Sequence, residues 1–262
     1  MEWTVWAGFA AGLLISTVTA PVGVSGAVFL LPVQLSVLGV PSPAVTPTNL
    51  LFNVVAGPGA LWRYRRDGAL RGSLARRLVL WTLPGVIAGA VVRVFALPGP
   101  DVFRTLVAAF LLPLGIWLCL RTLRAARHRP RTGSPEPSPA ALAVLALTVG
   151  VVGGIYGIGG GSLLGPVLAA RGMPLARIAP ATLAATFTTS VAGAAAYAVL
   201  ATTTTGPVAP DWWLGLACGA GGLIGGYLGA RLQPRLPEAV LSLLLGILAA
   251  ALGTLYAVQA LT

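Results

Sequence analysis

The 262-residue sequence contains no lysine, a single histidine and only six acidic residues. Charged residues make up 9% of the chain and hydrophobic residues 56%, and the mean hydropathy is +0.89. A soluble domain of this length needs far more charge to cover its surface. The scarcity of charge therefore excludes an ordinary soluble fold and indicates a chain whose solvent is the lipid bilayer.

No acidic residue and no histidine lies in the middle of an apolar stretch. The histidine is His128, and the acidic residues are Glu2, Asp67, Asp101, Glu136, Asp211 and Glu238. Proton relays and cation sites inside membranes use buried Asp, Glu or His, and metal sites need clusters of His, Cys or carboxylate ligands. A serine nucleophile at membrane depth would also lack the base that activates it. The sequence therefore predicts that the protein is not an enzyme and uses no metal or other cofactor.

All 17 basic residues are arginine, and most of them fall in two connections between apolar stretches. The first connection spans 63–77 and the second 121–131. A basic footprint is typical of nucleic-acid-binding proteins, but short arginine-rich loops are also what orients a protein in a bilayer. We therefore predict no nucleic-acid partner and a cytoplasmic position for both connections.

Charges and clusters of proline or glycine divide the sequence into eight apolar stretches. They cover 5–38, 43–62, 78–97, 102–120, 140–170, 178–201, 212–230 and 236–260. Most of them match the roughly 20 residues that cross the hydrocarbon core. The first and fifth are too long for one ordinary crossing and carry glycine and proline in their middle, so each is either one long kinked helix or a broken helical hairpin.

The chain consists of two related halves. Residues 21–26 align with 155–160, residues 41–50 with 174–183, and residues 85–98 with 221–234, at an offset of 133 to 136 residues. A near-constant offset over three patches indicates an internal duplication. The predicted units are a first transmembrane repeat at 1–124, a proline- and arginine-rich cytoplasmic linker at 125–139 and a second transmembrane repeat at 140–262.

The arginines decide between the two interpretations of the long stretches. Connection 231–236 carries arginine, like the two arginine-rich connections above, and is predicted to be cytoplasmic, whereas 201–211 carries no basic residue and is predicted to be external. Only a broken hairpin then lets 140–170 begin and end on the cytoplasmic side. The predicted fold is an all-α polytopic membrane protein of two inverted repeats. Each repeat is a broken or re-entrant helical hairpin plus three transmembrane helices, which makes about ten helical segments, and both chain termini lie outside the cell membrane.

Glycine and serine form the densest polar patch at membrane depth. The patch comprises Gly159, Gly160, Gly161 and Ser162 in the second half, with Ser25 and Gly26 at the corresponding place in the first. Glycine lets the backbone turn sharply and expose its N–H groups, and a helix that starts after such a turn favours an anion at its N-terminus. Small residues also serve close helix packing in membranes, and spacing alone does not separate the two interpretations.

Two polar helix faces accompany this patch. Asn49 and Asn53 are four residues apart and share a helix face, and the repeat matches them to Thr182 and Thr186. Such side chains could meet at the interface of the repeats near the bilayer midplane, where transport sites lie. The structural alternative is hydrogen bonding between helices or back to the same helix. We predict that the polar patch and these four residues bind substrate through uncharged hydrogen-bond donors, which suits a small anion.

The glycine-rich run at 157–162, followed by Pro166 and by a polar helix after Pro180, resembles the sulfite exporter TauE/SafE family. The first-half run at 48–56 is similar to a prokaryotic branch of that family, and the resemblance spans nearly the whole chain. The first half departs from the fuller pattern because residues 23–27 contain no triple glycine, so the two half-sites need not be equivalent. The resemblance implies a membrane permease, usually outward, for sulfite or organosulfonates such as sulfoacetate.

The predicted function is therefore transport, most naturally export, of a small sulfur-containing anion by alternating access at a site between the two repeats. The expected partners are this anion and the lipid bilayer of the cell membrane, and the sequence leaves homo-oligomerisation open. The alternative prediction is a channel-like anion pore, or a structural membrane protein, without alternating access.

Overall fold

The computed structural model describes most of the chain, and every regular element in the described part is helical. The described residues are 2–41, 44–70, 72–95, 101–125, 138–202 and 209–261. The α-helices in these ranges are α1 (Glu2–Thr19), α2 (Ala27–Ser36), α3 (Val45–Arg66), α4 (Ser73–Phe95), α5 (Asp101–Ala125), α6 (Pro139–Tyr156), α7 (Leu164–Ala170), α8 (Leu175–Ala201), α9 (Trp212–Leu232) and α10 (Glu238–Leu261). Two 3₁₀ helices, η1 (Ala20–Val22) and η2 (Gln233–Arg235), follow α1 and α9. The all-α prediction is confirmed for these residues, and most of the predicted linker at 125–139 lies outside them.

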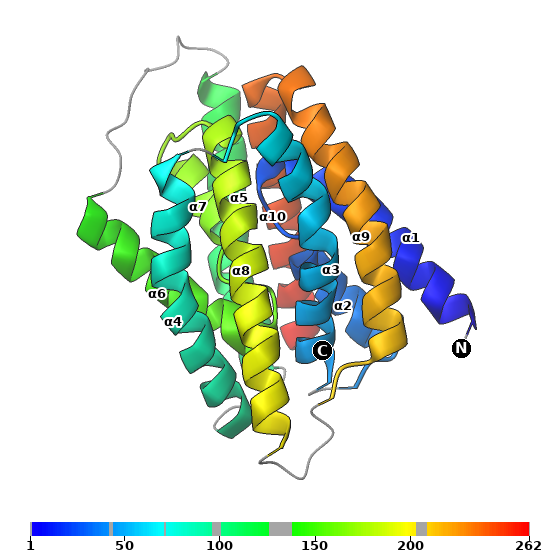
Figure 1. The fold of residues 1–262 in the computed structure, drawn as a ribbon. Coiled ribbons are helices and arrows are strands. Elements are labelled where there is room, and N and C mark those ends of the chain that lie inside the picture. The colour runs from blue at the N-terminus through cyan, green and yellow to red at the C-terminus, as the bar shows by residue number, and fades with distance from the viewer. Residues whose placement is uncertain are drawn as a thin grey trace.

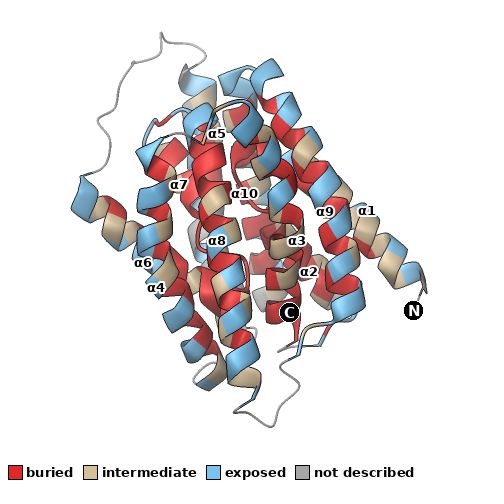
Figure 2. Ribbon diagram, in the orientation of Figure 1, coloured by how far each residue is buried: buried red, intermediate tan, exposed pale blue. Residues whose placement is uncertain are grey.

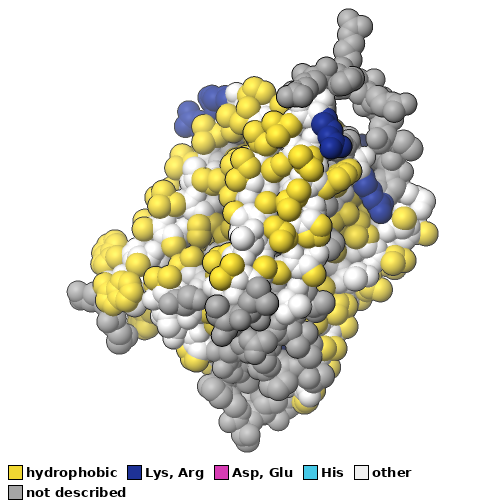
Figure 3. Space-filling model, turned by 180° about the vertical axis from the view of Figure 1, so that it is seen from behind, with side chains coloured by type: hydrophobic (Ala, Val, Ile, Leu, Met, Phe, Trp, Pro, Cys, Tyr) yellow, Lys and Arg dark blue, Asp and Glu magenta, His cyan; other side chains and the backbone are white. Residues whose placement is uncertain are grey.

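Six helical spans are long and apolar enough to cross a membrane, against the eight apolar stretches expected from the sequence. They are Trp3–Val22, Ser73–Phe95, Pro139–Tyr156, Leu175–Ala201, Trp212–Arg235 and Glu238–Gln259. The outward faces of the helices are exposed (Figure 2), and hydrophobic side chains cover much of the visible surface (Figure 3). A water-soluble monomer rarely exposes so large an apolar area. The protein is therefore a multi-pass membrane protein.

Both long apolar stretches are broken, as the sequence predicts. Helix α1 ends at Thr19, and after η1 the chain turns at Gly23, whose φ is 74°, before α2 begins at Ala27. Helix α6 ends at Tyr156 and turns at Gly157, whose φ is 69°. A backbone with positive φ suits glycine because it has no Cβ. Each long stretch is therefore a pair of helices joined by a sharp turn.

The helices of the two halves pack against each other reciprocally. Helix α1 packs along α9 and α6 along α4, α3 contacts α8 and α9, α8 also contacts α4, and α5 packs along α10. Glycines allow the closest approaches, since a Cβ on Gly85 would lie 2.4 Å from the carbonyl oxygen of Leu147, and one on Gly221 would lie 2.0 Å from that of Phe9. Small residues commonly allow such contacts between membrane helices. Because α1–α5 correspond to α6–α10 at the sequence offset, these contacts of one half have counterparts in the other.

Two tyrosines tie the helix breaks to the following long helices in the same way. The Tyr64 hydroxyl on α3 donates to the Ala20 carbonyl at 3.2 Å, and the Tyr197 hydroxyl on α8 donates to the Gly154 carbonyl at 3.1 Å. Both hydroxyls and both carbonyls are related by the offset of the duplication. Buried hydroxyls are normally hydrogen-bonded. The correspondence between the two halves therefore includes these two hydrogen bonds.

Arginine-bearing helix ends gather at one end of the molecule. The end of α3, which carries Arg63 and Arg66, the start of α4, and the turn between α9 and α10 all lie at the upper end in Figure 1. Arg63 pairs there with Asp67 at 3.0 Å. Helix α8 ends and α9 begins at the lower end.

Candidate anion-binding site

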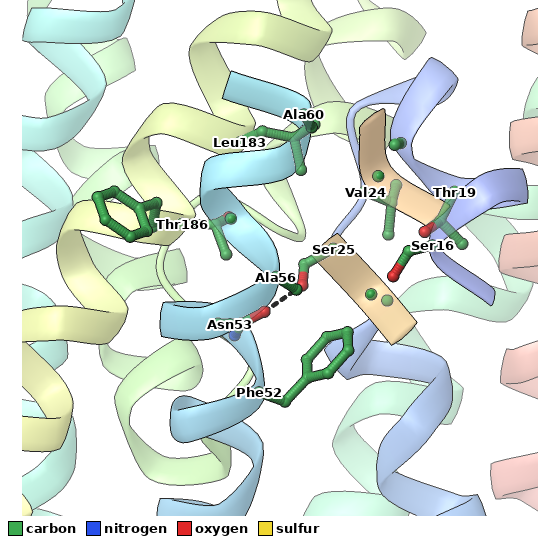
Figure 4. A pocket seen from close by; sticks show the side chains of 16 residues that line it. Ser16, Thr19, Val24, Ser25, Phe52, Asn53, Ala56, Ala60, Leu183 and Thr186 are labelled. Atoms are coloured by element: carbon green, nitrogen blue, oxygen red, sulfur yellow. Dashed lines mark hydrogen bonds between the residues drawn. The ribbon is translucent and has the colours of Figure 1, made fainter. Parts of the chain in front are cut away.

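A small, partly open cavity lies beside the first helix break, between α1, α3, α8 and α9 (Figure 4). Its volume is about 30 Å³. The lining residues come from four helices and the break, and none of them is charged: Ser16, Thr19, Ala20, Val24, Ser25, Gly26, Phe52, Asn53, Ala56, Gly57, Ala60, Leu183, Thr186, Phe187, Gly222 and Gly226. The cavity therefore combines an apolar wall with a few hydroxyl and amide groups, as small-molecule sites usually do.

Ser25 and Asn53 form the polar centre of this cavity. The Ser25 hydroxyl donates to the Asn53 side-chain oxygen and accepts the Ala27 N–H at 3.1 Å, where α2 begins. The Asn53 amide nitrogen donates to the carbonyl of Gly157, in the second helix break, at 3.5 Å. Asn53 is 3% exposed and Ser25 5%. This pair joins the first break, α3 and the second break at one point inside the membrane domain.

Four backbone carbonyls around the first break already have hydrogen-bond donors. The acceptors are the carbonyls of Thr19, Ala20, Pro21 and Gly23, and their donors are the Val24 N–H, the Gly23 N–H with the Tyr64 hydroxyl, the Gln233 amide and the Thr182 hydroxyl, respectively. Cation sites at broken membrane helices use such carbonyls as ligands. Because these oxygens are already paired, the cavity is better suited to an acceptor-rich ligand than to a cation.

Asn49 and Thr182 hold the first hairpin in place from behind the cavity. The Asn49 amide donates to the Ala27 carbonyl at 2.9 Å, and the Thr182 hydroxyl donates to the Gly23 carbonyl at 2.7 Å. Both side chains are fully buried, and neither lines the cavity. Of the four polar residues predicted on the two helix faces, only Asn53 and Thr186 line it.

The glycine-rich turn of the second half is packed tightly against α4 and α8. The Gly160 N–H donates to the Thr189 hydroxyl at 2.9 Å, and the Ser162 hydroxyl donates to the Ile158 carbonyl and lies 3.3 Å from the Thr186 hydroxyl. Cβ atoms on Gly159 and Gly161 would lie 2.6 Å and 2.0 Å from atoms of α8. In this conformation, Gly159, Gly160, Gly161 and Ser162 serve close packing between helices, which is the structural alternative to anion binding. Ser25 and Gly26, in contrast, line the cavity.

Replacing Gly161 with alanine tests the packing role. The added Cβ would lie 2.0 Å from the carbonyl oxygen of Thr182, so the glycine-rich turn and α8 would have to separate. We expect a loss of about 1 to 3 kcal/mol in stability, as is typical of overpacked sites. Thermal unfolding in detergent measures the change, with Gly226→Ala as the matched control because its Cβ would find its nearest atom at 3.4 Å. Unchanged stability together with lost anion binding would instead assign Gly161 to the site.

Two hydroxyls in the cavity are not among the site residues predicted from the sequence. Ser16 and Thr19 lie on the last turns of α1 and face Ser25 and Asn53 across the cavity (Figure 4). Their spacing of three residues places them on one helix face, which is a signal available in the sequence. Their counterparts at the repeat offset are glycines, so these two hydroxyls have no matching polar residues in the second half.

Among the described residues, no group of three or more His, Cys, Asp or Glu side chains could hold a metal ion. A multi-pass helical bundle with broken helices beside a cavity that carries uncharged polar groups has the architecture of a membrane transporter. The chain belongs to the sulfite exporter TauE/SafE family, whose model matches residues 8–256. The family resemblance found in the sequence is thereby confirmed. No curated protein and no solved structure gives a significant match.

Proposed function

We propose that the protein transports small sulfur-containing oxyanions, sulfite or organosulfonates such as sulfoacetate, and exports them from the cell. The proposal rests on the chemistry of the cavity, which is lined by uncharged hydroxyl and amide groups, while four of the nearby backbone carbonyls already have hydrogen-bond donors. An oxyanion accepts hydrogen bonds through several oxygens, and uncharged donors can bind it without a buried counter-ion. Membership of the sulfite exporter family supports the same substrate class.

The proposed mechanism is alternating access between two inverted repeats. Helices α3 and α4 run upward and downward in Figure 1, while their counterparts α8 and α9 run downward and upward. The reciprocal packing of the two halves supports the same relation. In transporters built this way, one repeat moves against the other around a site near the midplane. The gathering of arginine-bearing ends supports a cytoplasmic upper end, with both termini on the opposite side.

The size of the cavity supports a mechanism in which the site must open. A buried water needs about 10 to 15 Å³, so the present volume of about 30 Å³ accommodates about two waters. A sulfite ion has four heavy atoms and needs more room. Helices α3 and α8, which contribute Phe52 and Phe187 to the lining, therefore have to separate from the hairpin before substrate enters.

Binding of sulfite, thiosulfate, sulfoacetate, taurine and simple carboxylates to the purified protein tests the substrate class. We expect affinity for at least one sulfur oxyanion and none for acetate or succinate, because the carboxylates lack the pyramidal or tetrahedral set of oxygens. Isothermal titration calorimetry in detergent gives the dissociation constants. Failure of every oxyanion to bind would overturn the proposal.

Counterflow in proteoliposomes tests alternating access against a channel-like pore. A carrier loaded with unlabelled sulfite on the inside should accelerate entry of labelled sulfite from the outside, because each return step then carries substrate. A pore shows no such acceleration. Its absence, with net sulfite flux intact, would favour the pore.

A further inference from the structure

Thr19 is a buried hydroxyl with an unused hydrogen-bonding capacity. Its side-chain oxygen is fully buried and has no hydrogen-bond partner, and the residue is 1% exposed. Of the unpaired buried polar side-chain atoms in the described part of the chain, it is the one whose residue lines the cavity. Leaving a buried hydroxyl unpaired costs about 1 to 3 kcal/mol of stability. A ligand that hydrogen-bonds to Thr19 would recover this free energy.

Several other threonines of the membrane helices do not share this behaviour. The hydroxyls of Thr17, Thr48 and Thr189 each donate to the carbonyl four residues earlier, at 2.7, 2.7 and 2.6 Å. This back-bonding is the ordinary solution for a threonine inside a helix. Thr19 departs from it although it lies only two residues after Thr17 on the same helix. Its hydroxyl instead lies at the cavity beside Ser16 (Figure 4).

The counterparts of these two residues in the second half cannot do the same. At the offset of 134 residues, Ser16 and Thr19 correspond to Gly150 and Gly153. Cβ atoms on these glycines would lie 2.5 Å from the Thr82 carbonyl oxygen and 2.6 Å from the Gly159 carbonyl oxygen, so the second half has no room for a side chain there. The hydroxyl pair thus exists only at the first break, which breaks the symmetry of the duplication at the cavity.

We infer that Thr19, with Ser16 one turn earlier, donates hydrogen bonds to the transported oxyanion opposite Ser25 and Asn53. This inference rests on the proposed function and adds that the anion is held by the first hairpin, while the second hairpin closes the site by packing. The Thr19 hydroxyl is expected to donate its hydrogen bond to the anion, because the anion's oxygens are acceptors. Four of the nearby backbone carbonyls, which could otherwise accept from Thr19, already have donors. A hydrogen bond to a charged group contributes more than one between neutral groups.

Replacing Thr19 with valine removes the hydroxyl while keeping the shape of the side chain. We expect the dissociation constant for sulfite to rise about tenfold, the fold-change of losing a hydrogen bond to an ion. Thr17→Val is the matched control, because the Thr17 hydroxyl bonds to its own helix, and it should leave the dissociation constant unchanged. Thr19→Ser should restore affinity because it returns the hydroxyl. Calorimetric titration of the purified proteins with sodium sulfite measures all three.

Three results would overturn the inference. If Thr19→Val binds sulfite like the wild type while Asn53→Ala binds weakly, Thr19 has no role in binding and the proposed function stands. If the wild type binds no oxyanion, the proposed function and this inference fall together. If Thr19→Val does not fold, sulfite binding by Ser16→Ala is measured in its place. Its dissociation constant should rise several-fold, and an unchanged value would overturn the inference.

Discussion

Replacing Asn53 with aspartate should abolish sulfite transport. The side chain lines the cavity from the middle of α3 and is 3% exposed, so a carboxylate there would face the bound anion directly. Two like charges about 4 Å apart repel by about 4 kcal/mol at an effective dielectric constant of about 20, which corresponds to about three orders of magnitude in affinity. Sulfite flux in proteoliposomes at alkaline pH, where the carboxyl is ionised, measures the loss.

The neutral variant Asn53→Ala separates charge from truncation. It removes the hydrogen bonds to Ser25 and to the Gly157 carbonyl without adding a charge, so its flux should fall less than that of Asn53→Asp. Acidic pH should raise the flux of the aspartate variant relative to that of the alanine variant, because protonation removes the aspartate charge, whereas protonation of sulfite itself acts on both variants alike. Equal flux in the two variants at alkaline pH would argue against an anion at this position.

Replacing Gly59 with alanine should cause the largest loss of stability among single-methyl additions in α3. A Cβ at this position would lie 1.9 Å from the carbonyl oxygen of Leu223 on α9. Backbone atoms cannot rotate away as a side chain can, so the two helices would have to move apart. We expect a loss of about 3 kcal/mol, at the upper end of the usual range for overpacking, measured as the shift of the unfolding transition in detergent.

Gly226→Ala is the control for this interface. It adds the same methyl group between α9 and α3, but the nearest atoms would lie 3.4 and 3.5 Å away on Ala60. These are ordinary van der Waals distances, and stability should hardly change. Equal destabilisation by both substitutions would mean that the interface tolerates no added volume at either position. It would contradict the prediction that the close contact with the Leu223 carbonyl causes the loss of stability.

The sequence predicted the features that arise from composition and local backbone chemistry. The low charge indicated a membrane protein, and the long stretches with internal glycine predicted the helix breaks, which occur at Gly23 and Gly157. The constant offset predicted corresponding positions, and the hydrogen bonds of Tyr64 and Tyr197 lie at that same spacing. The low charge, the glycine positions and the offset are properties of the sequence itself and require no knowledge of which helices meet.

The residues that line the cavity could be predicted only in outline, because the same residue types serve binding and packing. Four of the ten predicted residues line the cavity: Ser25, Gly26, Asn53 and Thr186. A glycine exposes its N–H groups or allows a close helix contact according to what lies opposite it. For Gly161 that neighbour is the carbonyl oxygen of Thr182 on another helix.

By itself, the sequence predicted two related halves and determined a helical, multi-pass membrane protein with two broken helices and uncharged polar groups at membrane depth. Only the tertiary structure decided that the cavity forms beside the first break, and that Ser16 and Thr19 line it while Asn49 and Thr182 support it from behind. The physical reason is that a buried polar group is defined by its partners. Those partners come from helices as far apart in the chain as α1, α3 and α8, and their meeting depends on how closely the glycine contacts let these helices approach.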